Sequence, residues 1–560
     1  MRLLLLFFCW ACQPVYAQLF PAKNYPQGYF CWPVKAAPGL AANFGELRPN
    51  HYHMGLDCKT EQRENVPIVA AADGYIAKVK IEPFGFGRCL YINHPNGLTT
   101  LYAHLNDFEP ALEKYVTALQ YRQESWNLFT ELEADKFPVK KGQFIGYSGN
   151  TGGSQGPHLH FEVRDTKTDK VLNPLLFGFP IPDQVPPVVQ RLALYDRNRS
   201  TYEQSPRFFP VSKNSGSYSP APNLIQINTD KVSFGITAFD CYSGSTNQNG
   251  IFEALLYDND QLITGFQLDS ISYDETRYLN GHIDYKLRIG GGPFVQHLSR
   301  LPGFPQGTYR DAAGDGVIDL SDGSMHSIRI LVKDTRGNAS TVRFSIKSTG
   351  RQPYLAQQAP LFEPGQMNVA ENESVSLYLA ETQLYDSVHF RIKPATAEHE
   401  GKAFLLGTGD IPVHSFYPVK IRNSTTKHPD RMVMKRWWNN KDDYAKAEQQ
   451  GDWYRSSFKA LGYVELYADT IPPAIVSTNL SDGMDASRMG SIFLVVKDET
   501  DEFRNFRATL DGKWLRFTND KGRKFVYKFD EHCPPGAHEL KLHVEDCAGN
   551  ATERTYHFTR

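Results

Sequence analysis

The segment Gly156-Pro157-His158-Leu159-His160-Phe161-Glu162-Val163 alternates polar and apolar residues. A period of two is typical of a β-strand, whose successive side chains point to opposite faces. We therefore expect the two histidines and Glu162 on one face, and the three apolar residues in the core. On such a strand the Cα atoms of His158 and His160 lie about 6.5 Å apart. One imidazole can then bind a metal ion while the other reaches a water molecule at that ion.

Two earlier segments, His53-Met54-Gly55-Leu56-Asp57 and Leu101-Tyr102-Ala103-His104-Leu105, complete a metal-binding pattern. Zinc in hydrolases takes three nitrogen or oxygen ligands from the protein and keeps a fourth position for water. An HxxxD pair plus one histidine of HxH supplies such a set, and Gly55 frees the backbone to bring His53 and Asp57 around one ion. We also expect Tyr102 and His104 to share a strand face that points to the same place.

In this order, HMGLD, YAHL and GPHLHFEV resemble the signature of the lysostaphin/LytM family of metallo-endopeptidases, and the glycine-rich residues 146–152 are similar to the family's approach to HLHFE. The resemblance spans roughly residues 40–165. It implies an antiparallel β core, zinc on His53, Asp57 and His160, catalytic roles for His104 and His158, and peptide bridges of peptidoglycan as substrates. His51 is the rival ligand, but only His53 has an aspartate four residues later.

Strand patterns separated by Gly, Pro and Asn turns surround these motifs and predict an antiparallel β domain over residues 18–184. The strands are expected at Ile68–Ala72, Tyr75–Ile81, Cys89–His94, Leu98–His104, Gln143–Ser148 and His158–Arg164. At about residues 108–137 the spacing of Leu112, Val116 and Leu119 becomes helical, which predicts an insertion that leaves the sheet. We expect this insertion to pack against the β domain; the alternative is that it covers the cleft.

After Pro180 one pattern occurs twice. Val185-Pro186-Pro187-Val188 and Ile471-Pro472-Pro473-Ala474 each begin a segment that ends in a strand, an Asp, a Gly-Asn turn and a second strand. Each ending predicts a β-hairpin, and the repetition predicts two related β-sandwiches over residues 185–350 and 469–560. Both resemble the immunoglobulin-like modules of bacterial surface proteins. Residues 351–468 are expected to form a third β-rich module.

The N-terminus carries Arg2, the apolar run Leu3–Trp10 and a small-residue cleavage pattern at Val15-Tyr16-Ala17, so residues 1–17 are predicted to be a signal peptide. Cys9 and Cys12 do not follow a good lipobox, which disfavours a lipid anchor. No later segment has the roughly 20 apolar residues that a membrane helix needs. We expect a secreted protein of the periplasm, cell envelope or cell exterior.

The 560-residue chain has a formal net charge of −2, so no overall basic field attracts nucleic acid or anionic lipid. The six cysteines outside the signal peptide are too few to be the framework of so long a chain. Cys533 and Cys547 are the favoured bonded pair, and buried thiols are the alternative for the others. The acidic run Asp311, Asp315, Asp319 and Asp322 is expected to be a solvated loop, because Ala313 stands where a calcium loop needs an oxygen ligand.

These observations favour a secreted zinc endopeptidase that hydrolyses peptidoglycan cross-links. The alternative is a non-catalytic LytM-like regulator that activates other wall hydrolases, and a third class is an adhesin or scaffold that works through its β modules. Because relatives that have lost activity typically lose metal ligands, and all five expected positions are filled here, we favour the enzyme. The β modules are expected to hold it against wall or envelope protein partners.

Overall fold

The computed structural model describes residues 19–560 except 215, 352, 354–357, 400, 425, 501 and 502. The predicted signal peptide lies outside the described residues. Strands dominate the described chain, so the prediction of a mainly β protein is confirmed. None of the helices in the described residues is long and apolar enough to cross a membrane.

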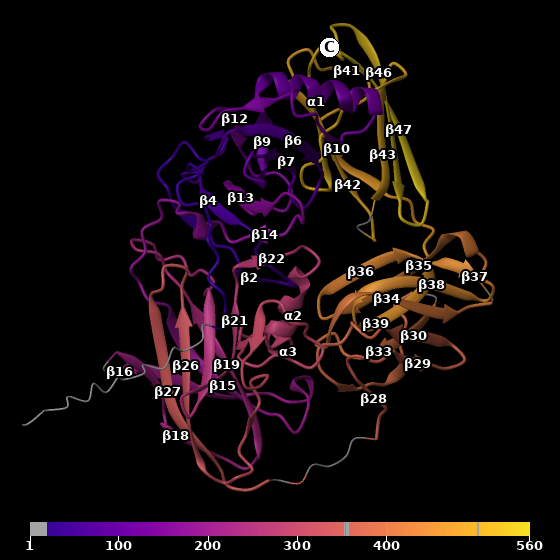
Figure 1. Cartoon of the computed structure of the whole chain (residues 1–560). Coiled ribbons are helices and arrows are strands. Elements are labelled where there is room, and N and C mark those ends of the chain that lie inside the picture. Colours follow the sequence, from indigo (N-terminus) through magenta and orange to yellow (C-terminus); the bar gives the residue numbers. More distant parts are fainter. Residues whose placement is uncertain are drawn as a thin grey trace, which may run out of the picture.

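The N-terminal domain is built on a large, mostly antiparallel sheet with β13 (His158–Asp165) near its centre (Figure 1). Strand β13 lies between β4 (Leu56–Lys59) and β8 (Leu98–Ala103). The apolar residues of β13 are fully buried in the domain core, as the alternation predicts. Further strands of this sheet are β1 (Leu40–Ala42), β7 (Arg88–Asn93), β6 (Gly74–Ile81), β10 (Leu128–Glu131), β11 (Pro138–Val139) and β14 (Val171–Leu172). A smaller sheet contains β5 (Pro67–Val69), β12 (Phe144–Ser148) and β9 (Leu105–Phe108), and β2 (Leu47–Arg48) and β3 (His51–Tyr52) form a hairpin.

Helix α1 (Pro110–Gln123) forms the first half of the predicted insertion. The Glu109 carboxylate accepts the backbone N–H groups of Ala111 and Leu112 and so caps the helix N-terminus. The apolar face of the helix packs into the core of the sheet, as expected. The second half differs from the prediction, because β10 returns to the sheet and pairs with β6 rather than leaving it.

The second module has one long curved sheet and two short helices, α2 (Leu279–His282) and α3 (Tyr285–Ile289). The hairpin predicted at its Gly-Asn turn is the pair β26 (Met325–Lys333) and β27 (Ala339–Ser348). The other main strands of this sheet are β15 (Val188–Asp196), β16 (Arg207–Asn214), β17 (Ser217–Pro220), β19 (Lys231–Phe239), β20 (Glu253–Asp258) and β21 (Gln261–Gln267). Strand β22 (Ser270–Ile271) pairs with β14 and ties this module to the first domain.

The third module shares a continuous hydrophobic core with the second. It contains two five-stranded sheets. The first contains β29 (Asn368–Glu371), β30 (Val375–Leu379), β34 (Pro412–Arg422), β38 (Trp453–Ala460) and β37 (Glu448–Gln450). The second contains β32 (Ile392–Ala395), β33 (Lys402–Leu406), β39 (Gly462–Ala468), β35 (Met432–Trp438) and β36 (Lys441–Lys446).

The last module turns back and packs on the first domain beside α1 (Figure 1). Arg507 forms an ion pair with Glu124, and the rings of Tyr121 and His532 stack with centroids 3.7 Å apart. Its strands are β40 (Ala474–Thr478), β42 (Ser491–Lys497) and β45 (Lys524–Lys528) in one sheet, and β41 (Met484–Asp485), β47 (Ala551–Thr559), β46 (Ala537–Asp546), β43 (Phe503–Leu510) and β44 (Lys513–Trp514) in the other. The predicted hairpin is β46 with β47.

The favoured disulfide between Cys533 and Cys547 is wrong, because both thiols are free. The two cysteines flank the ten-residue strand β46, and at about 3.3 Å per residue its ends lie roughly 30 Å apart. A disulfide needs Cα atoms within about 7 Å. The other cysteines of the described chain are free as well.

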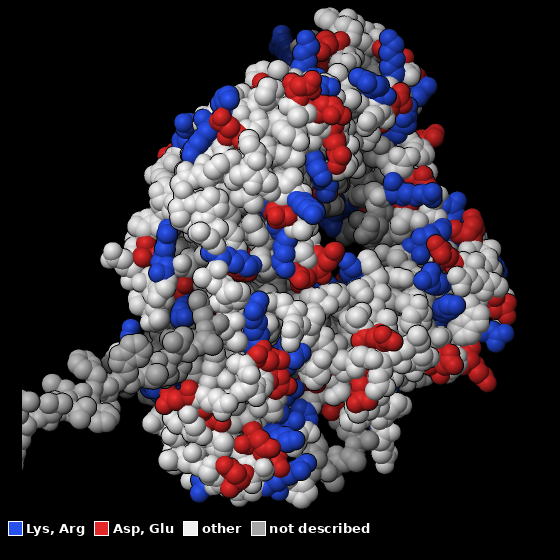
Figure 2. All heavy atoms as spheres, in the orientation of Figure 1, with Lys and Arg blue, Asp and Glu red and all other residues white. Residues whose placement is uncertain are grey.

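The surface carries Lys and Arg side chains mixed with Asp and Glu (Figure 2). This face has no continuous basic area, in agreement with the small net charge.

Candidate metal centre

Three ligand residues of the first domain meet at one point. The pairing of β13 with β4 places His160 directly opposite Asp57, and His53 lies shortly before β4. Nε2 of His53 is 3.0 Å from Nδ1 of His160 and 2.9 Å from Oδ1 of Asp57, and the last two atoms are 3.1 Å apart. All three residues are less than a tenth exposed.

The donor set fits a zinc ion. Two imidazole nitrogens and a carboxylate oxygen are a usual protein ligand set for catalytic zinc, and ligand atoms around a tetrahedral zinc lie roughly 3.3 Å apart. The observed separations of 2.9–3.1 Å are close to that value. The structure thus brings together the three predicted ligands, whereas the exposed His51 lies outside the cluster with its Nδ1 2.9 Å from the Pro49 carbonyl oxygen.

The outer nitrogen of each ligand histidine is held by the protein. Nδ1 of His53 is 2.7 Å from the carbonyl oxygen of Asn43, and Nε2 of His160 is 2.9 Å from Oε1 of Glu162. A partner on the outer nitrogen fixes the ring orientation and leaves the inner nitrogen to bind metal. The ligand geometry is therefore organised by the protein itself.

The two predicted catalytic histidines are held in the same way at the edge of the cluster. Nδ1 of His104 is 2.9 Å from the carbonyl oxygen of Thr151, and Nδ1 of His158 is 2.8 Å from that of Gly156. Nε2 of each ring is thereby left for the site, and Nε2 of His158 lies 3.3 Å from Oδ1 of Asp57. The two ring centroids are 4.9 Å apart, so both imidazoles reach the same small space.

The expected shared face of Tyr102 and His104 is wrong. The side chain of Tyr102 is fully buried in the core, where its hydroxyl accepts the backbone N–H of Ala71. His104 follows the end of β8 with a backbone φ of 62°, in the left-handed region. This turn interrupts the strand alternation and directs the imidazole to the metal cluster.

Burial and neighbouring charges set the protonation states of the site. Burial would raise the pKa of Asp57, but His53 and the other histidines hold it well below its usual value. Burial would lower the pKa of His160, but its hydrogen bonds with Asp57 and Glu162 raise it to about 9. Burial, together with His160 and His158, lowers the pKa of His104 to about 3. His104 is therefore a neutral proton acceptor at pH 7.

A second layer of residues holds Glu162, to which the sequence argument gave no role beyond its strand face. Its Oε2 accepts a hydrogen bond of 2.7 Å from Nε of Arg164, and its Oε1 accepts one of 2.5 Å from the hydroxyl of Tyr273. Tyr273 belongs to the second module, so no pattern in the first domain pointed to it. Arg48 donates a hydrogen bond of 3.2 Å to Oδ2 of Asp57.

A cleft of about 1120 Å³ shares Arg48, the hydrogen-bond partner of Asp57, with the surroundings of the metal cluster. Arg48 forms part of its wall, together with residues of the second and third modules. Six Lys and Arg side chains line the cleft against three Asp and Glu, and these basic residues are Arg48, Arg277, Arg288, Arg436, Lys441 and Lys459. The cleft therefore has an excess of positive charge next to the candidate site.

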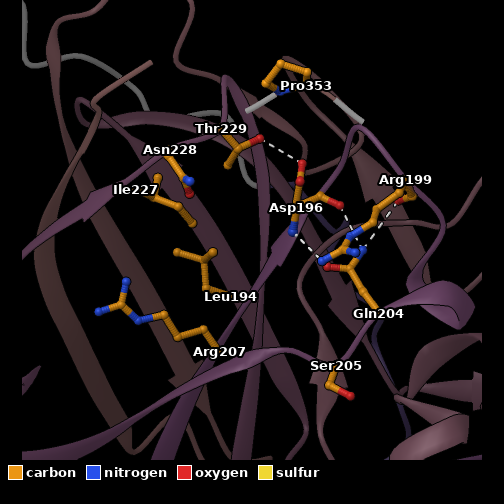
Figure 3. Close-up of a pocket in the computed structure, with 10 residues that line it drawn as sticks. All are labelled: Leu194, Asp196, Arg199, Gln204, Ser205, Arg207, Ile227, Asn228, Thr229 and Pro353. Atoms are coloured by element: carbon orange, nitrogen blue, oxygen red, sulfur yellow. Dashed lines mark hydrogen bonds between the residues drawn. The ribbon is translucent and has the colours of Figure 1, made fainter. Parts of the chain in front are cut away.

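A different pocket, of about 460 Å³, lies in the second module (Figure 3). Its polar groups are largely bonded to one another: Thr229 donates to Asp196, and the side-chain amide of Gln204 bonds to both the N–H and the C=O of Asp196. None of its lining residues belongs to the metal cluster. No histidine is among the described residues that line this pocket, and it is not the catalytic candidate.

Two family models match parts of the chain. The family model described as peptidase family M23 matches residues 51–121 and 128–174, and a Zu5-like domain model matches residues 359–469. A DD-carboxypeptidase/endopeptidase Mpg of Neisseria meningitidis serogroup B is 34% identical over 131 residues, which are 23% of this chain and 24% of that protein. The cell division protein DipM of Caulobacter vibrioides is 30% identical over 144 residues, 26% of this chain and 19% of that protein.

Among solved structures, the catalytic domain of the prophage-encoded M23 protein EnpA from Enterococcus faecalis is 22% identical. The match covers 27% of this chain and 99% of that domain, with a TM-score of 0.21. The similarity to the curated relatives spans only about a quarter of their length. The M23 family model matches only the domain that carries the metal cluster.

Proposed function

Because its N-terminal domain belongs to peptidase family M23, of the lysostaphin/LytM type, we propose that this protein is a secreted zinc endopeptidase that hydrolyses peptide cross-links of bacterial peptidoglycan. The observation that carries the proposal is the convergence of His53, Asp57 and His160 within 2.9–3.1 Å. Two further histidines complete the site with their outer nitrogens held by backbone carbonyls. All five positions that the proposed reaction uses are thus filled.

Each residue has a proposed role in the reaction. His53, Asp57 and His160 hold zinc, which supplies a Lewis acid that polarises the scissile carbonyl and makes water more acidic. His104, neutral at pH 7, accepts the proton of the attacking water. His158, whose Nδ1 proton is donated to the Gly156 carbonyl, takes a second proton on Nε2 in this proposal and donates it as a hydrogen bond to the oxygen of the scissile carbonyl as negative charge develops there. Glu162 keeps the His160 ring in its binding orientation.

The basic cleft beside the metal cluster is our candidate for the rest of the substrate. Its excess of Lys and Arg complements the free carboxylates of peptidoglycan peptides. The second and third modules form much of its wall, so in this proposal they take part in substrate binding as well as in holding the enzyme at the wall. Envelope proteins are proposed as partners of the remaining module surfaces.

The proposal is tested by digesting isolated sacculi with the mature zinc-loaded protein and identifying the products by mass spectrometry. We expect cleaved cross-links with the wild type, none after chelation, and none with His53→Ala. The matched control is His51→Ala, two residues away, exposed and outside the cluster, which should digest like the wild type. If the zinc-loaded wild type cuts no muropeptide but stimulates another wall hydrolase, the non-catalytic regulator replaces the enzyme.

A further inference from the structure

Three carboxylates outside the histidine site meet where the first domain joins the second module. Asp183 lies in the connection that precedes β15, Asp240 follows β19, and Asp334 begins the turn between β26 and β27. Each offers an oxygen, and these oxygens lie within 4.8 Å of one another. We call these three residues the acidic cluster.

The acidic cluster contains buried oxygens that have no hydrogen-bond partner. Asp240 is 1% exposed and its Oδ1 is unpaired, and Oδ2 of Asp183 is also buried and unpaired. In the described chain no Lys or Arg forms an ion pair with any of the three carboxylates; the nearby Arg336 instead donates to the carbonyl oxygens of Phe179 and Ile181. Burial, with Asp183 and Asp334 as neighbours, raises the pKa of Asp240 to about 8. Buried carboxylates this close need a cation or a shared proton.

A corresponding set of carboxylates occurs in the last module, although its oxygens do not form a group within 4.8 Å of one another in the described chain. Asp469 lies two residues before Ile471-Pro472-Pro473, just as Asp183 lies two residues before Val185-Pro186-Pro187. Asp498 follows β42, and Asp546 begins the turn between β46 and β47. Oδ2 of Asp469, a residue that is 1% exposed, and Oδ1 of Asp498 are again buried and unpaired. Glu499 adds a fourth carboxylate, whose pKa is raised to about 7 by burial and by Asp469.

The bonds around the two clusters agree in detail. Asp334 accepts the N–H and side-chain amide of Asn338, and Asp546 accepts those of Asn550. The same Asn side chains also reach the carbonyl oxygens of Asp183 and Asp469, at 3.5 and 3.2 Å. Each turn thus holds its own aspartate toward the aspartate of the preceding connection. The two modules thus share one pattern in which the corresponding oxygens are left unpaired, and in the second module these oxygens also lie within 4.8 Å of one another.

We propose that each cluster binds one calcium ion, through Asp183, Asp240 and Asp334 in the second module and through Asp469, Asp498 and Asp546 in the last. The donors are all oxygens, which suits a hard cation rather than zinc. With calcium–oxygen distances of about 2.4 Å, oxygens on opposite sides of the ion lie about 4.8 Å apart. Each ion would join the connection before a module to two loops of that module and so fix the angle between neighbouring domains.

The test is calcium titration of the full-length, zinc-saturated protein by isothermal calorimetry, with unfolding temperature as a second measurement. We expect two calcium ions per chain, a rise of several degrees in the unfolding temperature, and a smaller response to magnesium. Asp240→Asn should remove one ion and Asp498→Asn the other, and circular dichroism would establish that each variant is folded. Asp319→Asn, an exposed carboxylate outside both clusters, is the matched control and should keep both ions.

The wild-type result alone can overturn the proposal. Absence of calcium binding at millimolar concentration, with an unchanged unfolding temperature, would mean that the clusters share protons instead. A single ion lost in Asp240→Asn but kept in Asp498→Asn would retain the first site and overturn the second. Because none of these substitutions touches the histidine site, the outcome is independent of peptidase activity.

Discussion

The histidine site of the first domain and the acidic cluster of the second module both gather three ligand residues from separate elements. In the histidine site the outer nitrogen of each ligand histidine is bonded to a backbone carbonyl or a carboxylate. The inner nitrogens therefore already point toward the position of the metal. In the acidic cluster the donors are oxygens only, and two of them have no bonding partner in the described chain. The donor types and the way they are held indicate a catalytic zinc in one place and a structural calcium in the other.

The two sites also differ in what they connect. The histidine site arises inside one sheet, from the register that pairs His160 with Asp57. The acidic cluster arises between a connecting segment and two loops. Removing a ligand should therefore lower turnover in the first case and change the angle between neighbouring domains in the second.

The largest effect is expected from His104→Ala and His158→Ala. Each should lower turnover by about 10²–10⁴-fold, because a positioned proton acceptor or donor is lost. Zinc content should stay at one per chain, since neither imidazole belongs to the three-ligand cluster. Metal analysis beside a muropeptide assay measures both quantities. Loss of zinc in His158→Ala would show that this residue is a ligand and would end the proposed division of roles.

Glu162→Gln should weaken zinc binding by about 10–100-fold, the usual range for losing the carboxylate partner of a ligand histidine. The amide oxygen still accepts from His160, but the negative charge that Arg164 and Tyr273 stabilise is gone. Competition with a chromogenic chelator measures the affinity. Tyr273→Phe removes one hydrogen bond to the Glu162 carboxylate but keeps its charge, so it is the graded control, with a smaller loss. If both variants lost the same amount of zinc affinity, the loss would come from altered packing and not from the missing charge of Glu162.

Zinc affinity should fall about tenfold for each pH unit below pH 9. The pKa of His160 is raised to about 9 in the metal-free protein, so its imidazolium must lose a proton before Nδ1 can bind. Below that pKa each unit of pH lowers the unprotonated fraction tenfold. Zinc titrations between pH 6 and 8, with proton release measured in two buffers, test this. A pH-independent affinity would show that His160 is neutral before the metal arrives.

The sequence predicted the histidine site because its information is local. Strand alternation in residues 158–163 and the spacing of His53 and Asp57 are both visible in short windows, and the sheet register then brings them together. The strands and the first turns of the insertion followed the same local rules. The structure brings the three predicted ligands together and places the rings of His104 and His158 beside them.

The parts that the sequence did not predict depend on contacts between distant segments. Tyr273 reaches Glu162 from another module, and the acidic cluster combines a connection with two turns far apart in the chain. In the sequence, calcium binding was considered only for the acidic run that begins at Asp311. In the structure Asp311 forms an ion pair with Arg300. The wrong disulfide came from favouring two cysteines because both lie in one small C-terminal unit, within which β46 separates them.

The smallest effect is expected from the contact that joins the last module to the histidine site. Nζ of Lys521 donates to the carbonyl oxygens of Gly152 and Ser154, at 3.1 and 2.7 Å. The same glycine-rich loop supplies the carbonyl oxygens that hold His104 and His158. The module therefore contacts the loop that orients both catalytic imidazoles.

Lys521→Ala should lower turnover less than about threefold, because an exposed contact contributes under about 1 kcal/mol. The KM for muropeptides should not change, since Lys521 does not line the basic cleft. Lys513→Ala, equally exposed on the same module, is the matched control and should leave both constants unchanged. A loss above tenfold in Lys521→Ala alone would mean that docking of the last module is required to assemble the catalytic site. The modules would then act on the chemistry itself as well as on where the enzyme is held.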